Sequence, residues 1–471
     1  MSDIIQDRYQ KLDLLVKKGI DPFGGKFSVS LPIKSIVADF KIGEKATIAG
    51  RIMAKRKHGK SIFADLRDEA EKMQLYLNND ILGADKFEIV DSMLDIGDII
   101  GASGELFKTR TGEPTLKVED FTVLSKGLRP LPEKWHGLKD VETRYRQRYL
   151  DLIANPTVRE VFKVRSEIIK SIRSILDSKG YLEVETPMMQ PIAGGAAGKP
   201  FKTHHEALAM DLYLRIAPEL YLKRLLVGGF EKVYEINKSF RNEGISIRHN
   251  PEFTMLEVYT AYSDCEGTME LTKELITETA RKVLGKDKIE YQGRVIDLTK
   301  WETVSFADIM KDSYDINPED NEKDWVKKLK AKGVEIESNI VSRTAIANII
   351  ADLLTPKSDH PVFVVDMFKD LCPLAKIKKG APLLTDRFEL FMGGMEVANA
   401  YSELNNPVEQ KERFEAQGAG SEIDEDFVRA LEYGMPPAGG LGIGIDRLVM
   451  VLTDSPSIRD VILFPQLRKE V

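Results

Sequence analysis

The sequence predicts an α+β protein with a small β-barrel near the N-terminus and a larger domain in which strands alternate with helices. Two observations support this fold class. Five short segments between about residues 45 and 125 alternate apolar and polar residues, as strands do. Later in the chain, strand patterns, two pairs of which are predicted to form antiparallel hairpins, are interleaved with helical patterns.

The composition favours a soluble protein that contacts no membrane. The 471 residues are enough for two or three domains, and 42% of them are hydrophobic and 30% charged. No apolar run approaches the ~18 residues that a membrane helix needs, and the N-terminus has no signal-peptide pattern. The two cysteines, Cys265 and Cys372, are far apart in the chain, which argues against a zinc site. We therefore expect a cytoplasmic protein.

The net charge of −7 is unevenly distributed. Residues 1–60 carry 13 Lys and Arg against 6 Asp and Glu, whereas residues 151–471 carry 42 against 52. A basic N-terminal end on an acidic body fits a local contact with a polyanion. A solvated basic helix and loop would explain the same excess.

Residues 1–125 are expected to form a helix followed by a five-stranded barrel. An amphipathic helical pattern covers residues 1–18 and ends at a glycine. A helical segment near residues 82–92 separates the third strand from the fourth, as in an OB-fold. The five expected strands are ATIAGRIMAK, SIFADLRD, KMQLYLN, DIIGASGELFKT and TLKVEDFTVL.

A linker is expected at residues 126–154, because this segment contains prolines and shows no periodic pattern. The second domain then covers residues 155–471. Its first helix is predicted over Pro156–Lys179, where apolar residues follow helical spacing, and YLEVETP is predicted to form the next strand. An irregular, charged helical insertion is expected at about residues 307–356.

The segment SFRNEGISIRHNPEF, residues 239–253, joins two strand patterns into an antiparallel hairpin with a long loop. A planar guanidinium such as that of Arg241 suits a carboxylate or a phosphate, and His249 lies just beyond it. An ordinary polar loop with surface ion pairs is the alternative. Period two places four residues on one face of the return strand, which are Phe253, Met255, Glu257 and Tyr259.

A glycine-spaced strand runs into a helix over Gly439–Leu452. Gly440, Gly442 and Gly444 have no Cβ, so a flat ligand can lie against this strand. Arg447 at the start of the helix would reach an anion there. Close packing of strand and helix would also explain the glycines, and the pattern is neither a P-loop nor a dinucleotide fingerprint.

A third segment, Asp386–Leu404, is predicted to form a hairpin around Gly393-Gly394. With a two-residue loop, Phe391 faces Glu396, and Glu389 and Glu396 share one face of the hairpin. We expect neither glutamate to have a cationic partner nearby in the sequence. Two such carboxylates suit Mg²⁺ that carries nucleotide phosphates, whereas exposed strand glutamates are the simpler alternative.

Together these segments resemble the signature motifs of class II aminoacyl-tRNA synthetases. YLEVETP with Pro187 resembles motif 1, FRNEG…RHNPEF motif 2, and GLGIGIDR motif 3. APELYLKR, GGMEVANAYSELNNP, RPLPEKWHGLKD and RYRQRYLDL are similar to bacterial-type class II lysyl-tRNA synthetases, over nearly the whole chain. The resemblance implies a class II catalytic domain, which is a mostly antiparallel sheet flanked by helices. It also implies an enzyme that activates L-lysine with ATP and Mg²⁺ and transfers it to the 3′-terminal adenosine of tRNA(Lys).

The resemblance assigns the ATP site to motifs 2 and 3. Arg241 would contact the α-phosphate and the lysine carboxylate, and it is the principal catalytic residue together with Arg447. Glu243 and Asn250 would lie near the adenine. Phe253 would stack on the base, and Arg447 would cover its other face and reach the γ-phosphate.

The remaining phosphate contacts are assigned to His249 and to Mg²⁺, of which the family binds up to three ions per subunit. Glu389 and Glu396 would hold the metal, so Glu389 also takes part in ATP binding. The lysine carboxylate itself attacks the α-phosphorus, so the chemistry needs alignment and charge neutralisation rather than a protein nucleophile.

The resemblance also implies a lysine site. Glu219 and the backbone of Gly195 would bind the α-ammonium group, Asn399 the carboxylate, and Tyr401 would cover the aliphatic stem. A buried ammonium group needs carboxylates and hydrogen bonds around it. The residues expected around the ε-ammonium group are Glu257, Tyr259 and Glu403.

Strict alternation conflicts with this assignment at one point. It places Asn399, Tyr401 and Glu403 on one face of their strand and Glu396 on the other. Either a bulge near Val397–Ala398 or a longer hairpin loop would bring them together, and the sequence leaves both open.

In the barrel, Phe63 would stack on an anticodon base, unless it is a core residue of a packed strand, and the basic run Lys55-Arg56-Lys57 would meet phosphates. The family often has Arg at position 55, and the loop with Ala207 and Ala209 also departs from the usual pattern. The residues that resemble anticodon contacts are Phe63, Gln74 and Glu119.

Three other functions are compatible with part of the sequence. An aspartyl- or asparaginyl-tRNA synthetase shares this domain arrangement, but Glu257, Tyr259 and Glu403 suit an amine. A paralogue that attaches lysine to elongation factor P resembles the catalytic domain alone, so the barrel argues against it. A non-enzymatic RNA-binding or signalling protein would not need intact activation residues. Because motif 1 builds the subunit interface in class II enzymes, we also expect a homodimer.

Overall fold

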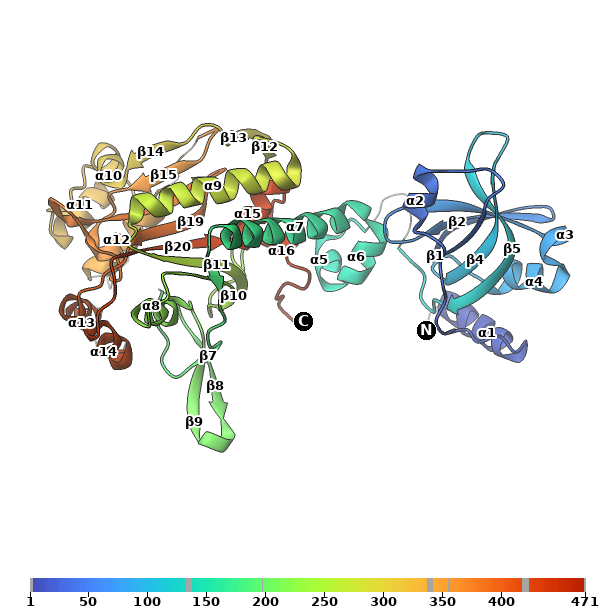
Figure 1. Ribbon diagram of the computed structural model, residues 1–471, viewed down its shortest axis with the longest axis horizontal. Helices are drawn as coiled ribbons and strands as arrows, with labels where there is room; N and C mark the ends of the chain where they lie inside the picture. The colour runs from blue at the N-terminus through green and yellow to red at the C-terminus, as the bar shows by residue number, and fades with distance from the viewer. Residues whose placement is uncertain are drawn as a thin grey trace. The chain divides into compact units, whose positions relative to one another are not determined.

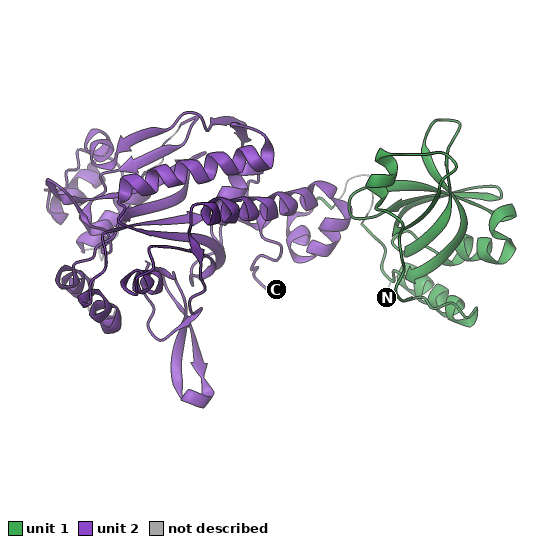
Figure 2. Ribbon diagram, in the orientation of Figure 1, with its two compact units in different colours: residues 1–139 green, residues 140–471 purple. Residues whose placement is uncertain are grey.

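The chain divides into two compact units, residues 1–139 and 140–471 (Figure 2). Part of the predicted linker, residues 133–137, and part of the predicted insertion, residues 337–341 and 355, lie outside the described residues. Within the described residues, no helix has the length and apolar character that crossing a membrane would require. The computed structural model describes residues 3–132, 138–196, 198–336, 342–354, 356, 358–416 and 423–469.

The first unit is a closed barrel with strand order β1-β2-β3-β5-β4, as Figure 1 shows. Alternate residues of its strands point into the barrel, where Ile62, Ala64 and Leu66 of β2 are buried. The barrel and the helical segment between its third and fourth strands confirm the prediction. Its elements are α1 (Asp3–Lys17), α2 (Ile33–Ala38), β1 (Lys45–His58), β2 (Ser61–Arg67), β3 (Lys72–Asn78), α3 (Asn79–Leu82), α4 (Ala84–Glu88), the π-helical turn η1 (Ile89–Met93), β4 (Ile99–Lys108) and β5 (Pro114–Ser125).

The second unit is built on an eight-stranded sheet with order β14-β15-β18-β19-β20-β11-β10-β6. Neighbouring strands are antiparallel except for the pairs β14–β15 and β10–β6. The mostly antiparallel sheet is therefore confirmed. Its strands are β6 (Leu182–Glu183), β10 (Lys232–Phe240), β11 (Glu252–Ala261), β14 (Glu302–Ser305), β15 (Val362–Val365), β18 (Arg387–Met392), β19 (Met395–Ser402) and β20 (Ala438–Gly444).

Helices cover the sheet and enclose its core. Three of them, α7, α9 and α15, pack against one another and on the sheet (Figure 1), with the α7 residues Ile168 and Ile172 fully buried in this core. Helix α8 packs on β10 and β11 and has its own buried cluster with α14. The bounds of these helices and of their neighbour α13 are α7 (Pro156–Ser178), α8 (Glu219–Val227), α9 (Cys265–Leu284), α13 (Pro407–Ala416), α14 (Glu425–Glu432) and α15 (Ile445–Leu452).

The predicted insertion is helical and has a separate core around Trp325, which is fully buried. It contains α10 (Phe306–Tyr314), α11 (Glu322–Ala331) and α12 (Arg343–Asp352). The smaller elements of the unit are α5 (Val141–Arg146), α6 (Arg148–Ala154), β7 (Met189–Gln190), β8 (Phe201–His205), η2 (Glu206–Leu208), β9 (Met210–Leu214), β12 (Lys288–Tyr291), β13 (Arg294–Asp297), η3 (Lys369–Leu371), β16 (Ile377–Lys378), β17 (Ala381–Thr385) and α16 (Ile458–Val461).

Two segments differ from the expectation. Part of the expected linker forms α5 and α6, where the buried Arg148 pairs with Asp151 at 2.6 Å and donates to the Leu463 carbonyl at 3.0 Å. These helices are too short to show a helical period in the sequence. In YLEVETP only Leu182–Glu183 forms a strand, which pairs with β10 at the edge of the sheet.

The hairpin β18–β19 contains the bulge that the sequence left open. Its loop is Gly393-Gly394, with positive φ at both glycines, which is typical of a tight two-residue turn. Phe391 lies opposite Glu396, as predicted, but Leu390 lies opposite Ala398, so Val397 is the extra residue. The bulge turns Glu396 toward Asn399, whose amide lies 3.4 Å from the carboxylate.

Candidate active site

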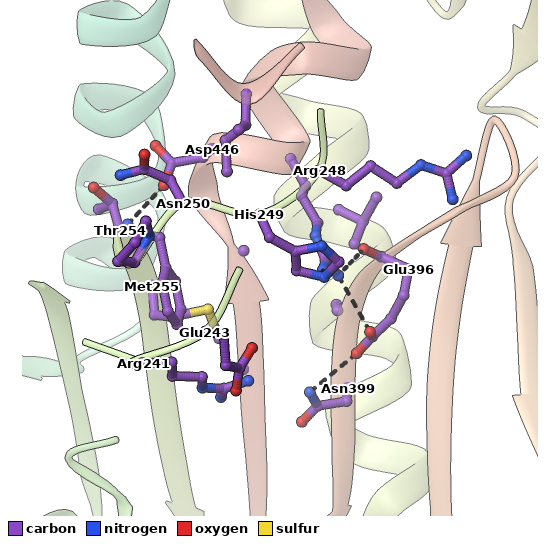
Figure 3. A pocket seen from close by; sticks show the side chains of 18 of the residues that line it. Arg241, Glu243, Arg248, His249, Asn250, Thr254, Met255, Glu396, Asn399 and Asp446 are labelled. Carbon is purple, nitrogen blue, oxygen red and sulfur yellow. Dashed lines mark hydrogen bonds and ion pairs between the residues drawn. The ribbon is translucent and has the colours of Figure 1, made fainter. Parts of the chain in front are cut away.

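A pocket lies over β11, β19 and β20, beside the start of α15. Figure 3 shows Arg241 and Glu243 on one side of it and Glu396 and Asn399 on the other. The candidate residues that line this pocket are Arg241, Glu243, His249, Asn250, Phe253, Glu396, Asn399 and Arg447.

Arg241 is a partly buried cation at the edge of the pocket. Its backbone nitrogen donates to the Pro251 carbonyl at 2.9 Å, which fixes the base of the loop. Its guanidinium lies 5.2 Å from the centre of the Phe253 ring. Within the described residues Arg241 forms no ion pair, and its Nε has no hydrogen-bond partner. Burial lowers the pKa of this guanidinium, so an anion bound beside it would relieve an electrostatic cost.

Arg447, Glu396 and His249 form a connected group at the other end of the pocket. Arg447 donates to the Glu396 carbonyl at 2.9 Å and pairs with its carboxylate at 3.2 Å. The guanidinium also lies 3.2 Å from His249 Nε2. A guanidinium only donates, so Nε2 accepts and Nδ1–H donates to Ser246 Oγ at 2.9 Å. Burial and the neighbouring Arg447 lower the pKa of His249, which favours this neutral ring.

The two side chains predicted to lie near the adenine, Glu243 and Asn250, differ in exposure and in hydrogen bonding. Glu243 is exposed at the pocket edge, whereas Asn250 is buried and its amide donates to the Glu252 carbonyl at 2.6 Å. The Asn250 oxygen accepts from the Gln466 nitrogen at 3.3 Å. Asn250 therefore shapes the loop, while Glu243 keeps its carboxylate available.

The two expected metal ligands do have cationic partners, which corrects the premise that they lack them. Glu389 pairs with Arg387 at 2.5 Å, and Glu396 pairs with Arg447. Period two alone puts Arg387 and Glu389 on one face, so the sequence contained this pair. Burial raises the pKa of Glu389 to about 7, Arg387 opposes this shift, and the nearby Glu396 adds to it. The residues that the structure describes contain no group of three or more His, Cys, Asp or Glu side chains arranged so that it could hold a metal ion.

Sequence reasoning missed a buried network behind the pocket. Asp446, the residue before Arg447, accepts from the Thr254 backbone at 2.7 Å and pairs with Arg165 of α7 at 2.6 Å. Figure 3 shows Asp446 beside Thr254. This network ties the first helix of the unit to the return strand of the hairpin and to the start of α15. An arginine on a helix at ordinary spacing gives no hint of such a partner in the sequence.

Four of the predicted lysine-site residues lie side by side on the large sheet. Gly442 of the central strand β20 has Glu257 on one side and Asn399 on the other. Gly440 likewise lies between Tyr259 and Tyr401. Because the two glycines have no side chains, the strip of β20 between these pairs is left uncovered by its own residues, and we call this strip the trough. Its Gly442 end also lines the pocket, and a Cβ on Gly440 would lie 1.8 Å from Glu403 Oε1.

Three carboxylates and two phenols meet at the closed end of this trough. Tyr401 donates to Glu219 at 2.7 Å, and Tyr259 donates to Glu257 at 3.2 Å. Gly195 borders the group, since a Cβ on it would lie 3.4 Å from Glu219 Cβ. Burial raises the pKa of Glu257 to about 8, and the carboxylate of Glu219 adds to the shift. A ligand that carries ammonium groups would neutralise this cluster.

The sequence reasoning also missed Lys223, which is fully buried beside these carboxylates. Its Nζ lies 2.6 Å from Glu219 and forms an ion pair with Glu403. Lys223 follows Glu219 by four residues on α8, so helical spacing would have predicted the first of these contacts.

The barrel presents a row of aromatic rings on its outer face. Phe63 of β2 alternates with the buried residues Ile62 and Ala64, so it is not a core residue. Its ring centre lies 5.2 Å from that of Tyr76, which lies 5.9 Å from that of Phe107.

The other candidate anticodon residues lie on several strands of the barrel. Arg56 lies directly opposite Phe63, and its guanidinium approaches Asp65 at 3.5 Å. Gln74 accepts a hydrogen bond from Thr115 at 3.0 Å. Glu119 pairs with Lys45.

Lys55 does not join this row. It lies opposite the inward-facing Ala64, and its ammonium group donates to the carbonyls of Asp91 and Leu94, each at 2.8 Å. Burial lowers the pKa of Lys55. Lys57 likewise pairs with Asp91 at 2.5 Å. In this geometry only Arg56 of the basic run lies beside Phe63.

Comparisons with known proteins agree with both units. The family described as tRNA synthetases class II (D, K and N) matches residues 140–468, and an OB-fold nucleic acid binding domain matches residues 46–124. The lysine–tRNA ligase of Carboxydothermus hydrogenoformans is 55% identical over 482 residues, covering 99% of this chain and 98% of that protein. That of Pelotomaculum thermopropionicum is 53% identical over 99% of this chain and 95% of its own length. A lysine–tRNA ligase of Clostridium botulinum is 48% identical over 100% and 96%.

Proposed function

The chain belongs to the class II lysyl-tRNA synthetases, and from this premise we propose how its residues divide the reaction. The enzyme activates lysine with ATP and attaches it to tRNA(Lys). The observation that carries the proposal is the partly buried, unpaired guanidinium of Arg241 at the boundary between an open pocket and a trough of buried carboxylates. A cation at that boundary can hold two anions against each other.

Arg241 would grip the lysine carboxylate and the α-phosphate at once. Both anions repel each other, and the negative charge at the phosphate grows as the carboxylate oxygen attacks phosphorus. A fixed, desolvated guanidinium compensates that charge without reorganising, which is how preorganised donors accelerate a reaction. Arg447 would serve the distal end of the nucleotide, where it is already held by Glu396.

The nucleotide would lie in the open pocket with its base near Phe253. Glu243 is available to the adenine, and Asn250 would act mainly by shaping the loop. His249 is neutral and would have to release Arg447 or gain a proton to pair with the distal phosphates.

Mg²⁺ fits this site through Glu389 and Glu396. Both carboxylates lie on one face of the hairpin, and their mutual repulsion contributes to the raised pKa of Glu389, which a bound cation would relieve. When bound, the metal would neutralise phosphate charge. The two glutamates would supply the protein ligands, and phosphate oxygens would supply the other ligands. Arg387, which is paired with Glu389, would hold that carboxylate in place.

Lysine would lie in the trough between β11 and β19. Glu219 and the backbone of Gly195 would receive the α-ammonium group, and Asn399 would face the carboxylate near Arg241. Tyr401 would cover the stem. The residues proposed around the ε-ammonium group are Glu257, Tyr259 and Glu403, all of which are buried.

The barrel would bind the anticodon on its outer face. The ring of Phe63 and the guanidinium of Arg56 lie side by side there and would provide base stacking and phosphate contact. Gln74 and Glu119 would add base contacts. The enzyme would act in the cytoplasm, where tRNA is used.

A homodimer is supported by the edge of the large sheet. The edge strand β6 carries Leu182, which is 47% exposed, and the neighbouring Met188 and Met189 are 44% and 53% exposed. A second copy of the chain would cover this apolar group and the unpaired strand edge.

A non-reactive analogue of the intermediate tests the proposed lysine site directly. Lysyl-sulfamoyl-adenosine and its norleucyl counterpart differ only at the ε-ammonium position. Calorimetry should show the wild type preferring the lysyl compound by about two to four orders of magnitude, as expected for a buried ion pair worth ~3–5 kcal/mol. Glu403→Gln should remove most of this preference, whereas Asp151→Asn, a buried carboxylate outside the site, should leave it intact. Equal binding of both compounds by the wild type would contradict the proposal.

A further inference from the structure

The buried lysine beside the substrate carboxylates has no role in the reaction as described so far. Lys223 is fully buried, so its charge must be compensated inside the protein. Its Nζ lies 2.6 Å from Glu219 and pairs with Glu403 Oε2, and it lies 5.6 Å from the centre of the Tyr401 ring. Three of the residues assigned to the substrate are therefore organised around one internal ammonium group.

The charge balance of the trough depends on this lysine. Glu219, Glu257 and Glu403 are all buried, and the two tyrosines that contact them carry no charge. Burial acts to lower the pKa of Lys223, but Glu219 and Glu403 outweigh it and raise the pKa above its usual value. The amine therefore remains an ammonium ion at neutral pH. Burial and the neighbouring Glu219 raise the pKa of Glu403, and Lys223 opposes this shift, so loss of Lys223 would favour protonation of Glu403 further.

The two oxygens of Glu403 are in different situations. Oε2 forms the ion pair with Lys223, whereas Oε1 is buried against the backbone of Gly440 and has neither an ion-pair partner nor a hydrogen-bond donor in the described part of the chain. A buried carboxylate oxygen without a donor points to a missing ligand. The trough floor at Gly440 continues to Gly442 and to the nucleotide pocket, so the free oxygen faces the place where a substrate stem would end.

We propose that Lys223 is a positioning residue for lysine recognition. Its ammonium group holds Glu403 by one oxygen and Glu219 by a second contact, so that both carboxyl groups face the two ammonium groups of the substrate. The inference rests on the proposed lysine site. The two ammonium groups of the substrate complement the buried carboxyl groups of Glu219 and Glu403, which Lys223 orients. An acidic or apolar amino acid would leave the free oxygen of Glu403 without a donor.

A purely structural role for Lys223, as an anchor of α8 to the sheet, predicts a different result. Loss of such an anchor would lower stability and would change the KM values for lysine and ATP to a similar extent. Loss of a positioning residue would raise the KM for lysine selectively and would make it depend more strongly on pH, because Lys223 opposes the raised pKa of Glu403.

The experiment compares Lys223→Met with Lys126→Met by ATP–pyrophosphate exchange between pH 6.5 and 9. Lys126 is a matched control, because it is also fully buried between two carboxylates, Asp95 at 2.6 Å and Asp98 at 2.9 Å, in the barrel. Lys223→Met should raise the KM for lysine about 100-fold or more at pH 7, with the KM for ATP changed less than about threefold. That increase should shrink as the pH rises. Lys126→Met should leave both constants unchanged.

A double variant keeps the test decisive if Lys223→Met folds poorly. Lys223→Met combined with Glu403→Gln removes both charges of the pair, and its KM for lysine should lie within about threefold of that of Glu403→Gln alone. Independent, multiplicative effects would overturn the proposal, as would equal changes in both KM values with a flat pH profile. A wild type without lysine-dependent exchange would instead refute the proposed function itself.

Discussion

Replacing Arg241 with methionine separates catalysis from stability. Arg241 is partly buried without a carboxylate partner, and burial already lowers the pKa of its guanidinium. Methionine keeps the apolar stem beside Phe253 and removes the charge. Because an uncompensated buried charge costs free energy, we expect a gain of about 1–3 kcal/mol for the unit at residues 140–471. Adenylate formation should fall at least ~1000-fold, since even one preorganised donor is worth about 100–1000-fold.

Arg215→Met is the matched control for the stability measurement. Arg215 is more deeply buried, pairs with Glu235 at 2.6 Å and donates to the carbonyls of Lys238 and Thr186 at 2.8 and 3.0 Å. Breaking this pair leaves Glu235 buried with the Thr186 hydroxyl as a donor but without an ion-pair partner among the described residues, at a cost of about 3–5 kcal/mol. The two arginine variants should therefore change stability in opposite directions.

Differential scanning calorimetry and ATP–pyrophosphate exchange measure the two effects. Unfolding entropies of roughly 2 cal mol⁻¹ K⁻¹ per residue convert these free energies to a Tm about 1–4 °C higher for Arg241→Met and about 4–7 °C lower for Arg215→Met. A fall in Tm for Arg241→Met as large as that for Arg215→Met would refute the idea that Arg241 is an uncompensated charge. Exchange within about tenfold of the wild type would refute its role at the α-phosphate.

Three further predictions concern other parts of the chain. Phe63→Ala should weaken aminoacylation of tRNA(Lys) by an amount that reflects ~1–3 kcal/mol of base stacking and should leave lysine-dependent exchange unchanged; equal losses in both assays would contradict a role in tRNA binding. Burial raises the pKa of Glu257 to about 8 in the folded state. Its ionisation therefore lowers the free energy of unfolding progressively between about pH 4.5 and 8 and by a constant amount at higher pH. The Tm of Glu257→Gln relative to the wild type should therefore increase between pH 5 and 9, and a difference independent of pH would contradict that pKa. Light scattering should give twice the 53.1 kDa chain mass, and a stable monomer at micromolar concentration would exclude the homodimer.

The sequence predicted the parts of the fold that depend on local patterns. The barrel strands and the hairpins follow from period-two alternation. The turn at Gly393-Gly394 follows from two adjacent glycines, and both have positive φ in the structure. The bulge at Val397 could only be recognised as a conflict between alternation and the expected site, because a bulged strand has the same local composition as a regular one.

Partners across the fold were the main gap in the predicted site. The interaction of Arg165 with Asp446 joins segments far apart in the chain, so no local rule predicts it. The ion pair of Lys223 with Glu403 is of the same kind. By contrast, the pairing of Arg387 with Glu389 follows from the strand period and could have been predicted from the sequence.

The position of Lys55 shows a related limit. A basic run in a nucleic-acid-binding barrel suggests phosphate contacts for every member, yet alternation sends successive side chains to opposite faces. The ammonium group of Lys55 is used by the carbonyls of Asp91 and Leu94, whereas Arg56 lies opposite Phe63. The face of a strand therefore decides the role of a residue more than the charge of its segment.

ATP–pyrophosphate exchange with each of the twenty amino acids, without tRNA, tests the central claim that the trough and pocket activate lysine. The carboxylates Glu219, Glu257 and Glu403 should make lysine the only amino acid that supports rapid exchange, at least about 100-fold above any other. Exchange that is driven by aspartate or asparagine, or by no amino acid at all, would contradict the account.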